Sequence, residues 1–260
     1  MRVALGIAYR GSAYSGWQSQ PSGRTVQDHV EAALSAFADS PVAALSAGRT
    51  DAGVHALNQV VHFDTEAVRA ADGWVRGTNR YLPADIAVQW CRFVPAGFHA
   101  RASALGRRYA YLLLEAPVRP ALESGLAGWT FRTLDGDAMR RAAEAILGTH
   151  DFSAFRSSDC QALSPVKTLR ALAIGRRGAF WRFDFDADAF LHHMITNIVG
   201  SLVAVGSGAR SPEWLAGVLA QRDRALAAAT FAADGLYFLG PYYDAVHAIP
   251  DRTAAIDWLP

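Results

Sequence analysis

The sequence predicts an α+β protein with a largely antiparallel sheet flanked by helices. Strand-like and helix-like apolar patterns follow one another along the chain: residues 1–9 alternate, and a helical stripe starts at Val26. The same succession of strand-like and helix-like patterns returns after Arg107. Some of the expected strands follow one another as in hairpins, and others are joined by crossover connections. At 260 residues, of which 51% are hydrophobic, the chain is long enough to bury a substantial core.

The first part of the chain opens with a strand and a capped helix. Val3, Leu5, Ile7 and Tyr9 fall on one face of the alternating segment. Thr25 suits the N-cap of a helix, which carries apolar residues at helical spacing, namely Val26, Val30, Ala33, Leu34 and Phe37. Two extended runs, 41–45 and 58–63, are expected on either side of a glycine-rich turn.

The second part of the chain repeats this pattern. Strands are expected at 107–114 and 179–185, and a helix at 137–147. An apolar helical stripe runs from Leu191 and stops at Gly206, and Ser211 with Pro212 favours the start of a further helix. The loop 116–134, rich in proline and glycine, is the best candidate for a boundary between two halves.

Composition excludes several classes of protein. No apolar stretch approaches the roughly 20 residues that cross a bilayer, and the first residues do not resemble a signal peptide, so a cytoplasmic location is expected. The two cysteines, Cys91 and Cys160, lie far apart without a Cys/His grouping, so no metal site is predicted.

The net charge of +1 hides a local basic segment. Residues 86–114 contain no Asp or Glu but include Arg92, Arg101, Arg107 and Arg108. From charge alone, this segment is equally compatible with phosphate binding and with a solvated face that is balanced elsewhere in the fold.

The densest polar cluster is 47–56, where Arg49, Thr50 and Asp51 stand between two glycines. Glycines on both sides suit a loop that approaches a ligand closely. The neighbouring Arg49 favours an ionised Asp51, and such a carboxylate can act as a nucleophile or a base. The alternative interpretation is that Arg49 and Asp51 only tie a turn together.

The segment GRTDAGVHA strongly resembles the catalytic motif of the TruA family of tRNA pseudouridine synthases. Other segments resemble the same family, in the same order and at the same spacing: YRGSAYSGWQSQPSGRTVQ, NQVVHFDT, FHARASALGRRYAYLL, GTHDFSAFR, FLHHMITNIVGSL and DGLYFLGPYY. Nearly the whole chain is covered, which makes the resemblance far more specific than one short motif.

The resemblance implies two similar α/β halves around a basic RNA-binding cleft. Residues 1–103 would form the N-terminal half with the Asp51 motif, and residues 104–260 the half that completes the cleft. It also implies a homodimer that binds tRNA, needs no cofactor or metal, and isomerises uridines at positions 38 to 40 of the anticodon stem-loop.

The resemblance assigns roles to individual residues. Asp51 would be the catalytic nucleophile, attacking either the base or the sugar, and Tyr109 would stack on the flipped uracil. Arg49 and Leu236 would help to bind the substrate nucleotide. The RNA phosphates would be contacted by four arginines, Arg24, Arg101, Arg107 and Arg108.

One residue departs from the family pattern. Thr196 stands in HHMITNIVG where the family carries an arginine that pairs with the catalytic aspartate. Three interpretations are open. Arg49 could be the sole ion-pair partner of Asp51, which we favour, or another arginine could contact Asp51 from elsewhere in the fold. In the third, the chain binds RNA with reduced catalysis. The alternative functions are therefore a tRNA-binding folding aid and, more remotely, a hydrolase that uses Asp51 with His55.

Overall fold

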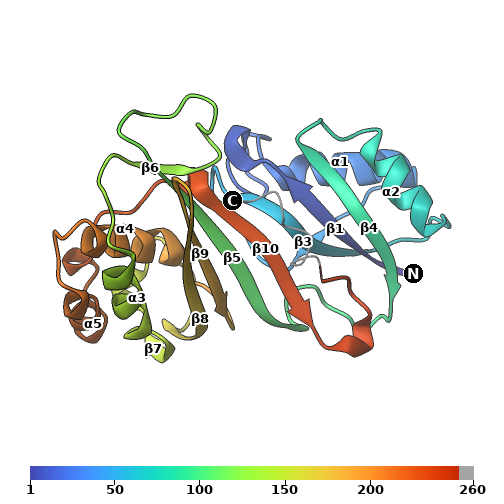
Figure 1. Cartoon of the computed structure of the whole chain (residues 1–260). Helices are drawn as coiled ribbons and strands as arrows, with labels where there is room; N and C mark the ends of the chain where they lie inside the picture. Colours follow the sequence, from blue (N-terminus) through green and yellow to red (C-terminus); the bar gives the residue numbers. More distant parts are fainter. Residues whose placement is uncertain (252–260) are drawn as a thin grey trace. The chain divides into compact units, whose positions relative to one another are not determined.

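The computed structural model describes residues 1–251 (Figure 1). The chain divides into two compact units. The N-terminal unit consists of Met1–Gly106 and the segment that begins at Tyr237, and the C-terminal unit is Arg107–Leu236. The division expected from the sequence instead assigns everything after residue 103 to the second half, so the two differ in where the last strand belongs.

The sheet of the N-terminal unit has the strand order β4-β1-β3-β10, with the short β2 paired to β3. Its strands are β1 (Arg2–Tyr9), β2 (Leu45–Ser46), β3 (His55–Asp64), β4 (Ile86–Val94) and β10 (Leu236–Tyr243). The pairs β1–β3, β1–β4 and β2–β3 are antiparallel, whereas β10 runs parallel to β3 with Tyr237 opposite His55.

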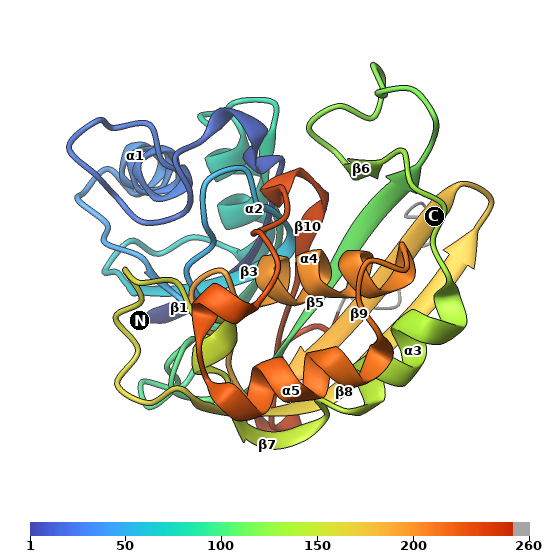
Figure 2. The same ribbon diagram turned by 90° about the vertical axis from the view of Figure 1, so that its left-hand side faces the viewer.

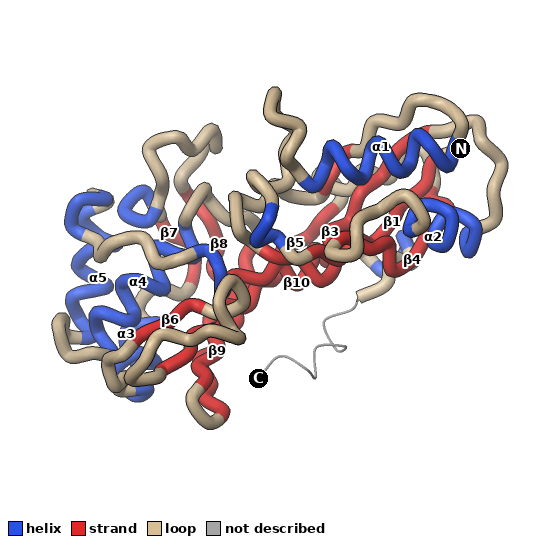
Figure 3. The backbone as a smooth tube through the Cα atoms, turned by 90° about the horizontal axis from the view of Figure 1, so that it is seen from above, coloured by secondary structure: helices blue, strands red, loops and turns tan. Residues whose placement is uncertain are grey.

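Two helices, α1 (Val26–Ala38) and α2 (Ala71–Asn79), pack on this sheet (Figure 3). The indole of Trp74 lies between the rings of Phe37 and Phe63, with centroids 5.2 Å from each. Thr25 caps α1 in a capping box with Asp28, as the sequence predicts. Aromatic packing thus joins both helices to β3, the strand that follows the Asp51 motif.

One apolar cluster joins β1, β3 and β4 to the turn before β5. Its buried members are Ala4, Ala47, Val60, Trp90, Val94, Phe98 and Ala100. The phenol of Tyr243 donates a hydrogen bond of 2.6 Å to the carbonyl of Ala100, which attaches β10 to this cluster. The strands β1 and β3 are buried along most of their length.

Within the C-terminal unit the strands follow the order β5-β9-β8-β7, with antiparallel pairing throughout this path. Its strands are β5 (Ala104–Glu115), β6 (Gly128–Thr130), β7 (Gly148–Asp151), β8 (Val166–Arg177) and β9 (Phe180–Ala187), and β6 runs parallel to β5. Along β9 the residues Trp181, Phe183 and Phe185 are buried, which confirms the alternation predicted there.

Three helices belong to this unit: α3 (Gly136–Glu144), α4 (Met194–Gly206) and α5 (Pro212–Gln221). They contact one another, and α3 contacts β8 (Figure 2). α4 is buried along nearly its whole length because its sequence is mostly apolar and its buried polar residues Thr196, Asn197 and Ser201 form hydrogen bonds. Single 3-10 turns lie at Gly11–Ala13, Ser153–Phe155, Arg224–Leu226, Ala233–Gly235 and Ala245–His247.

The predicted α+β class, with mostly antiparallel strands and flanking helices, is confirmed. The helix predicted from Leu191 begins three residues later, at Met194. His193 precedes it with φ +60°, a left-handed conformation that cannot continue a helix. Among the helices of the described residues, none combines the length and apolar character needed to cross a bilayer.

Candidate active site

Asp51 lies in the loop 47–54 between β2 and β3, which we call the Asp51 loop. The loop leaves the β2–β3 ladder just after Ala47, whose N–H donates 2.8 Å to Val60. It closes where the Val54 N–H donates 3.2 Å to the Asp51 carbonyl, and Gly53 there has φ +82°, a conformation that favours glycine. Asp51 is half-buried and Arg49 is exposed.

The segment 11–17 packs directly against the Asp51 loop. The Trp17 N–H donates a hydrogen bond of 3.0 Å to the carbonyl of Thr50. A Cβ atom at Gly16 would lie 2.7 Å from that same carbonyl oxygen, and one at Gly11 would lie 1.9 Å from the carbonyl of Val54. These two glycines are therefore needed for close approach of the backbones.

This segment is fixed in turn to the first turn of α1. The N–H groups of Val26 and Gln27 donate to the carbonyls of Gly16 and Trp17, at 3.1 and 3.0 Å. Arg24, one of the predicted RNA-binding residues, is exposed just before α1, and its carbonyl accepts a hydrogen bond from the Ser15 N–H at 2.9 Å. The structure thus connects Arg24 to the Asp51 loop through a short path of backbone hydrogen bonds.

His55 follows the Asp51 loop, and its ring is held by a hydrogen bond and a stacking contact. Its Nδ1 accepts the Gly11 N–H at 3.1 Å, and its ring stacks on Tyr237 with centroids 4.6 Å apart. The ring is buried. This surrounding gives no support to the hydrolase interpretation, in which His55 would act beside Asp51.

Arg101 is exposed on a turn just before β5. The turn is held by two histidines: the Ala100 N–H donates to Nδ1 of His62, and the Arg101 N–H donates to Nδ1 of His99, both at 3.1 Å. A guanidinium on a fixed and exposed turn suits a phosphate contact.

The C-terminal unit carries Tyr109 on β5, opposite Phe185 on β9. Its ring is mostly buried and packs edge-on against Phe190, with centroids 5.1 Å apart. Tyr111, on the same face, is fully buried, and its hydroxyl donates 2.7 Å to the carbonyl of Ala232. Tyr111 is thus fixed at both its ring and its hydroxyl.

Arg107 and Arg108 are half-buried and bind acidic residues or carbonyls near the end of β9. Arg107 donates 2.9 Å to the carbonyl of Asp188, and Arg108 lies 3.4 Å from the carboxylate of Asp186. Their predicted phosphate contacts would therefore compete with these protein partners.

The last two residues singled out by sequence, Leu236 and Thr196, are both buried in the C-terminal unit. Leu236 is the first residue of β10. The hydroxyl of Thr196 donates 3.0 Å to the carbonyl of His193, and the Thr196 carbonyl accepts from the N–H of Phe231 at 3.1 Å. Thr196 thus stabilises the start of α4. His192 and His193 precede this helix, with ring centroids 4.1 Å apart.

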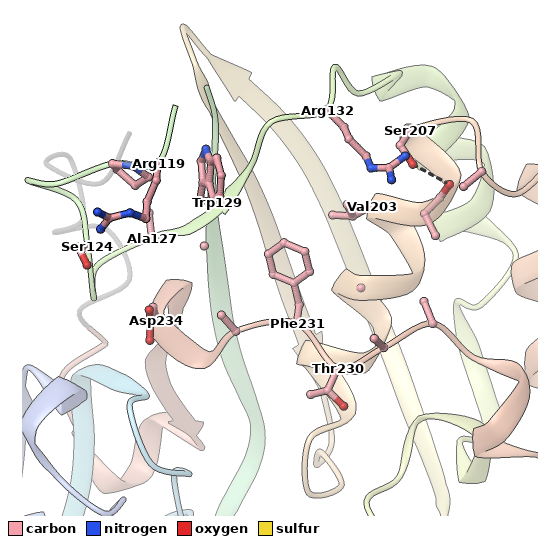
Figure 4. A pocket seen from close by; sticks show the side chains of 18 of the residues that line it. Arg119, Ser124, Ala127, Trp129, Arg132, Val203, Ser207, Thr230, Phe231 and Asp234 are labelled. Atoms are coloured by element: carbon pink, nitrogen blue, oxygen red, sulfur yellow. Dashed lines mark hydrogen bonds between the residues drawn. The ribbon is translucent and has the colours of Figure 1, made fainter. Parts of the chain in front are cut away.

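The C-terminal unit also contains a pocket of about 670 Å³ that the sequence did not indicate (Figure 4). Arg119 and Arg132 lie on either side of Trp129 and Phe231 in this view. Within residues 1–251, neither arginine forms an ion pair with a carboxylate. Aromatic faces beside available guanidinium groups suit a base and a phosphate.

Comparison with known proteins identifies relatives along the whole chain. A family described as tRNA pseudouridine synthase matches residues 6–101 and 142–244. The chain is 68% identical to tRNA pseudouridine synthase A of Methylibium petroleiphilum over 260 residues, with all of both chains covered. The enzymes of the same name from Polaromonas naphthalenivorans and Albidiferax ferrireducens are each 62% identical, again over the full length of both chains.

The chain therefore belongs to the tRNA pseudouridine synthase family. Within that family, its full-length relatives are of the A type, which confirms the resemblance identified from the sequence motifs. It is an enzyme of the isomerase class.

Proposed function

We propose that this chain converts uridine to pseudouridine in the anticodon stem-loop of tRNA, at positions 38 to 40, with Asp51 as the attacking carboxylate. The observation that carries the proposal is the position of Asp51. It stands on a glycine-closed loop, clamped by the backbone of Trp17, in a chain that belongs to the tRNA pseudouridine synthase family.

The reaction rearranges bonds within one nucleotide. The glycosidic bond between C1′ and N1 breaks, the uracil turns, and a new bond forms between C1′ and C5. The proton from C5 is lost and N1 gains one, so no atom is added and no redox cofactor is consumed. Asp51 attacks either the base or the sugar and is released unchanged at the end.

Such bond exchange requires the target nucleotide to leave the base stack, because its reacting atoms are inaccessible inside a stem. We propose that Tyr109 stacks on the extruded uracil and that Leu236 lines the same pocket. Support comes from the position of Tyr109 on a rigid strand, against Phe190. Arg49 would accompany Asp51 in the loop and compensate its charge.

Arginines would bind the phosphates of the RNA in a basic cleft. We propose the exposed Arg24 and Arg101 as the principal contacts, with Arg107 and Arg108 contributing from β5. Arg119 and Arg132, which the sequence did not single out, extend this set because both line an aromatic pocket in the C-terminal unit.

Three further features belong to this proposal. The two units would be similar α/β halves that together form the cleft. The protein would act as a homodimer, and it would work in the cytoplasm, where tRNA is found. Sedimentation of the purified chain tests the dimer directly, since a monomer at working concentration would contradict it.

A tRNA-folding aid with reduced catalysis is the second candidate function. It is favoured by a specific observation: Thr196 occupies the position of the family arginine and uses its hydroxyl within its own helix. A neutral hydroxyl cannot replace an arginine as an ion-pair partner for a carboxylate.

Pseudouridine mapping of unmodified tRNA distinguishes these candidates. The proposed enzyme modifies the anticodon stem-loop at positions 38 to 40, and Asp51→Asn binds the RNA without modifying it. A folding aid with reduced catalysis binds the same RNA, and even with Asp51 in place it modifies the anticodon stem-loop only slightly.

A further inference from the structure

We infer that Tyr9 and Gln59 are positioning residues of the pseudouridine-forming site, which hold the Asp51 loop in place through hydrogen bonds. They bind Thr50 and Gly48, the two neighbours of Arg49 in the chain. This inference rests on the proposed role of Asp51, and it extends that role to residues on two core strands, β1 and β3.

Tyr9 is the last residue of β1 and shares a hydrogen bond of 2.7 Å with the hydroxyl of Thr50. Both side chains are buried, with exposed fractions of 5% and 6%. Burial raises the pKa of the Tyr9 phenol far above its ordinary value, so the phenol stays neutral. A neutral buried phenol offers Thr50 a permanent and directional partner, 41 residues away in the chain.

Gln59 lies on β3, four residues after the start of that strand, and is fully buried. Its side-chain amide donates a hydrogen bond of 2.6 Å to the carbonyl of Gly48. The Oε1 atom of Gln59 has no hydrogen-bond partner in the described part of the chain. A buried amide with one unsatisfied atom costs stability, which a hydrophobic residue would avoid, and the bond to Gly48 offsets part of this cost.

Together with Trp17, these residues constrain the loop at three points. The Tyr9 phenol holds the Thr50 side chain, the Trp17 N–H holds the Thr50 carbonyl, and Gln59 holds Gly48. The peptide between Thr50 and Asp51 is thereby fixed from two sides. Because catalysis depends steeply on the placement of the attacking atom, loosening these contacts lowers the rate of the chemical step more than it lowers RNA affinity.

The test compares five variants at saturating tRNA: Tyr9→Phe, Thr50→Val, Thr50→Ser, the double variant of the first two, and Gln59→Leu. Tyr9→Phe and Thr50→Val each lower kcat by about tenfold or more, while the Kd for tRNA stays within about twofold. Thr50→Ser keeps the hydroxyl and retains most of the rate. Tyr9→Phe and Thr50→Val remove the same hydrogen bond. Their effects on kcat are therefore not additive in the double variant. Gln59→Leu likewise lowers kcat and leaves the Kd for tRNA within about twofold.

Tyr243→Phe is the matched control, since it also removes a tyrosine hydrogen bond inside the N-terminal unit, but one that lies at Ala100. It lowers the melting temperature without lowering kcat. If Tyr9→Phe behaves in the same way while Asp51→Asn is inactive, the positioning role is overturned and the role of Asp51 stands. An active Asp51→Asn variant would overturn the proposed role of Asp51 and this inference together.

Discussion

The rings of His62 and His99 lie with their centroids 4.7 Å apart, and both histidines hold the turn that presents Arg101. Burial lowers the pKa of His62 to about 4 from its ordinary 6.5, assisted by the nearby His99 and Arg2 and opposed by Asp64. The ring is therefore neutral at pH 7, and its Nδ1 can accept the Ala100 N–H.

This histidine makes the stability of the N-terminal unit depend on pH. The unfolded chain takes up a proton near pH 6.5 and the folded chain only near pH 4, so His62 contributes its stability fully above pH 6.5. That contribution is lost as the pH falls from 6.5 towards 4. Thermal unfolding measured across this range should show a falling melting temperature, and His62→Gln should flatten the curve. An unchanged slope in His62→Gln would contradict the assignment.

Arg49 is expected to be the main cation that stabilises Asp51, since Thr196 provides no charge. Replacing Arg49 with alanine should lower kcat by about a hundredfold, as the loss of a strong electrostatic partner does in other active sites. Thr196→Arg should recover part of this loss in the same chain. Single-turnover rates measure both effects. Arg76→Ala, which removes an exposed arginine on α2, is the control and should retain the wild-type rate.

If Arg49→Ala keeps the wild-type rate, Asp51 does not depend on Arg49. The interpretation that Arg49 alone replaces the family arginine would then be wrong.

The pocket of the C-terminal unit is expected to bind RNA through Arg119 and Arg132. Replacing both with alanine should weaken tRNA binding. The slope of log K against log salt concentration should become shallower by roughly 1 for each phosphate that is no longer bound. The rate at saturating tRNA should not change. The double variant Arg141→Ala/Arg177→Ala removes two exposed arginines of the same unit outside the pocket and serves as the control. An equal salt slope in the two double variants would exclude phosphate binding in the pocket.

Local sequence patterns predicted much of the fold. The cap at Thr25 and the alternation along β9 are short-range signals, and the structure confirms both. α2 was not predicted because it contributes one large apolar residue, Trp74, whose role depends on Phe37 and Phe63. β10 was not predicted as a strand either, since its parallel pairing with β3 joins segments about 180 residues apart.

The same contrast holds for the site. Asp51 could be singled out because its polar and glycine neighbours are adjacent in the chain. Tyr9 could not, because in sequence it is one of four residues on the core face of a strand. Its bond to Thr50 exists only in the folded chain. The pocket arginines were missed for a similar reason, since they come from a loop that sequence analysis considered only as a boundary.

The most direct test of the account is the rate of pseudouridine formation at saturating tRNA in Asp51→Asn, compared with Asp72→Asn. Asp72 is an exposed carboxylate in the first turn of α2 and serves as the matched control. The account predicts that Asp51→Asn binds tRNA with wild-type affinity and forms no pseudouridine, while Asp72→Asn retains the wild-type rate. Pseudouridine formed by Asp51→Asn at a rate close to that of Asp72→Asn would contradict the central claim.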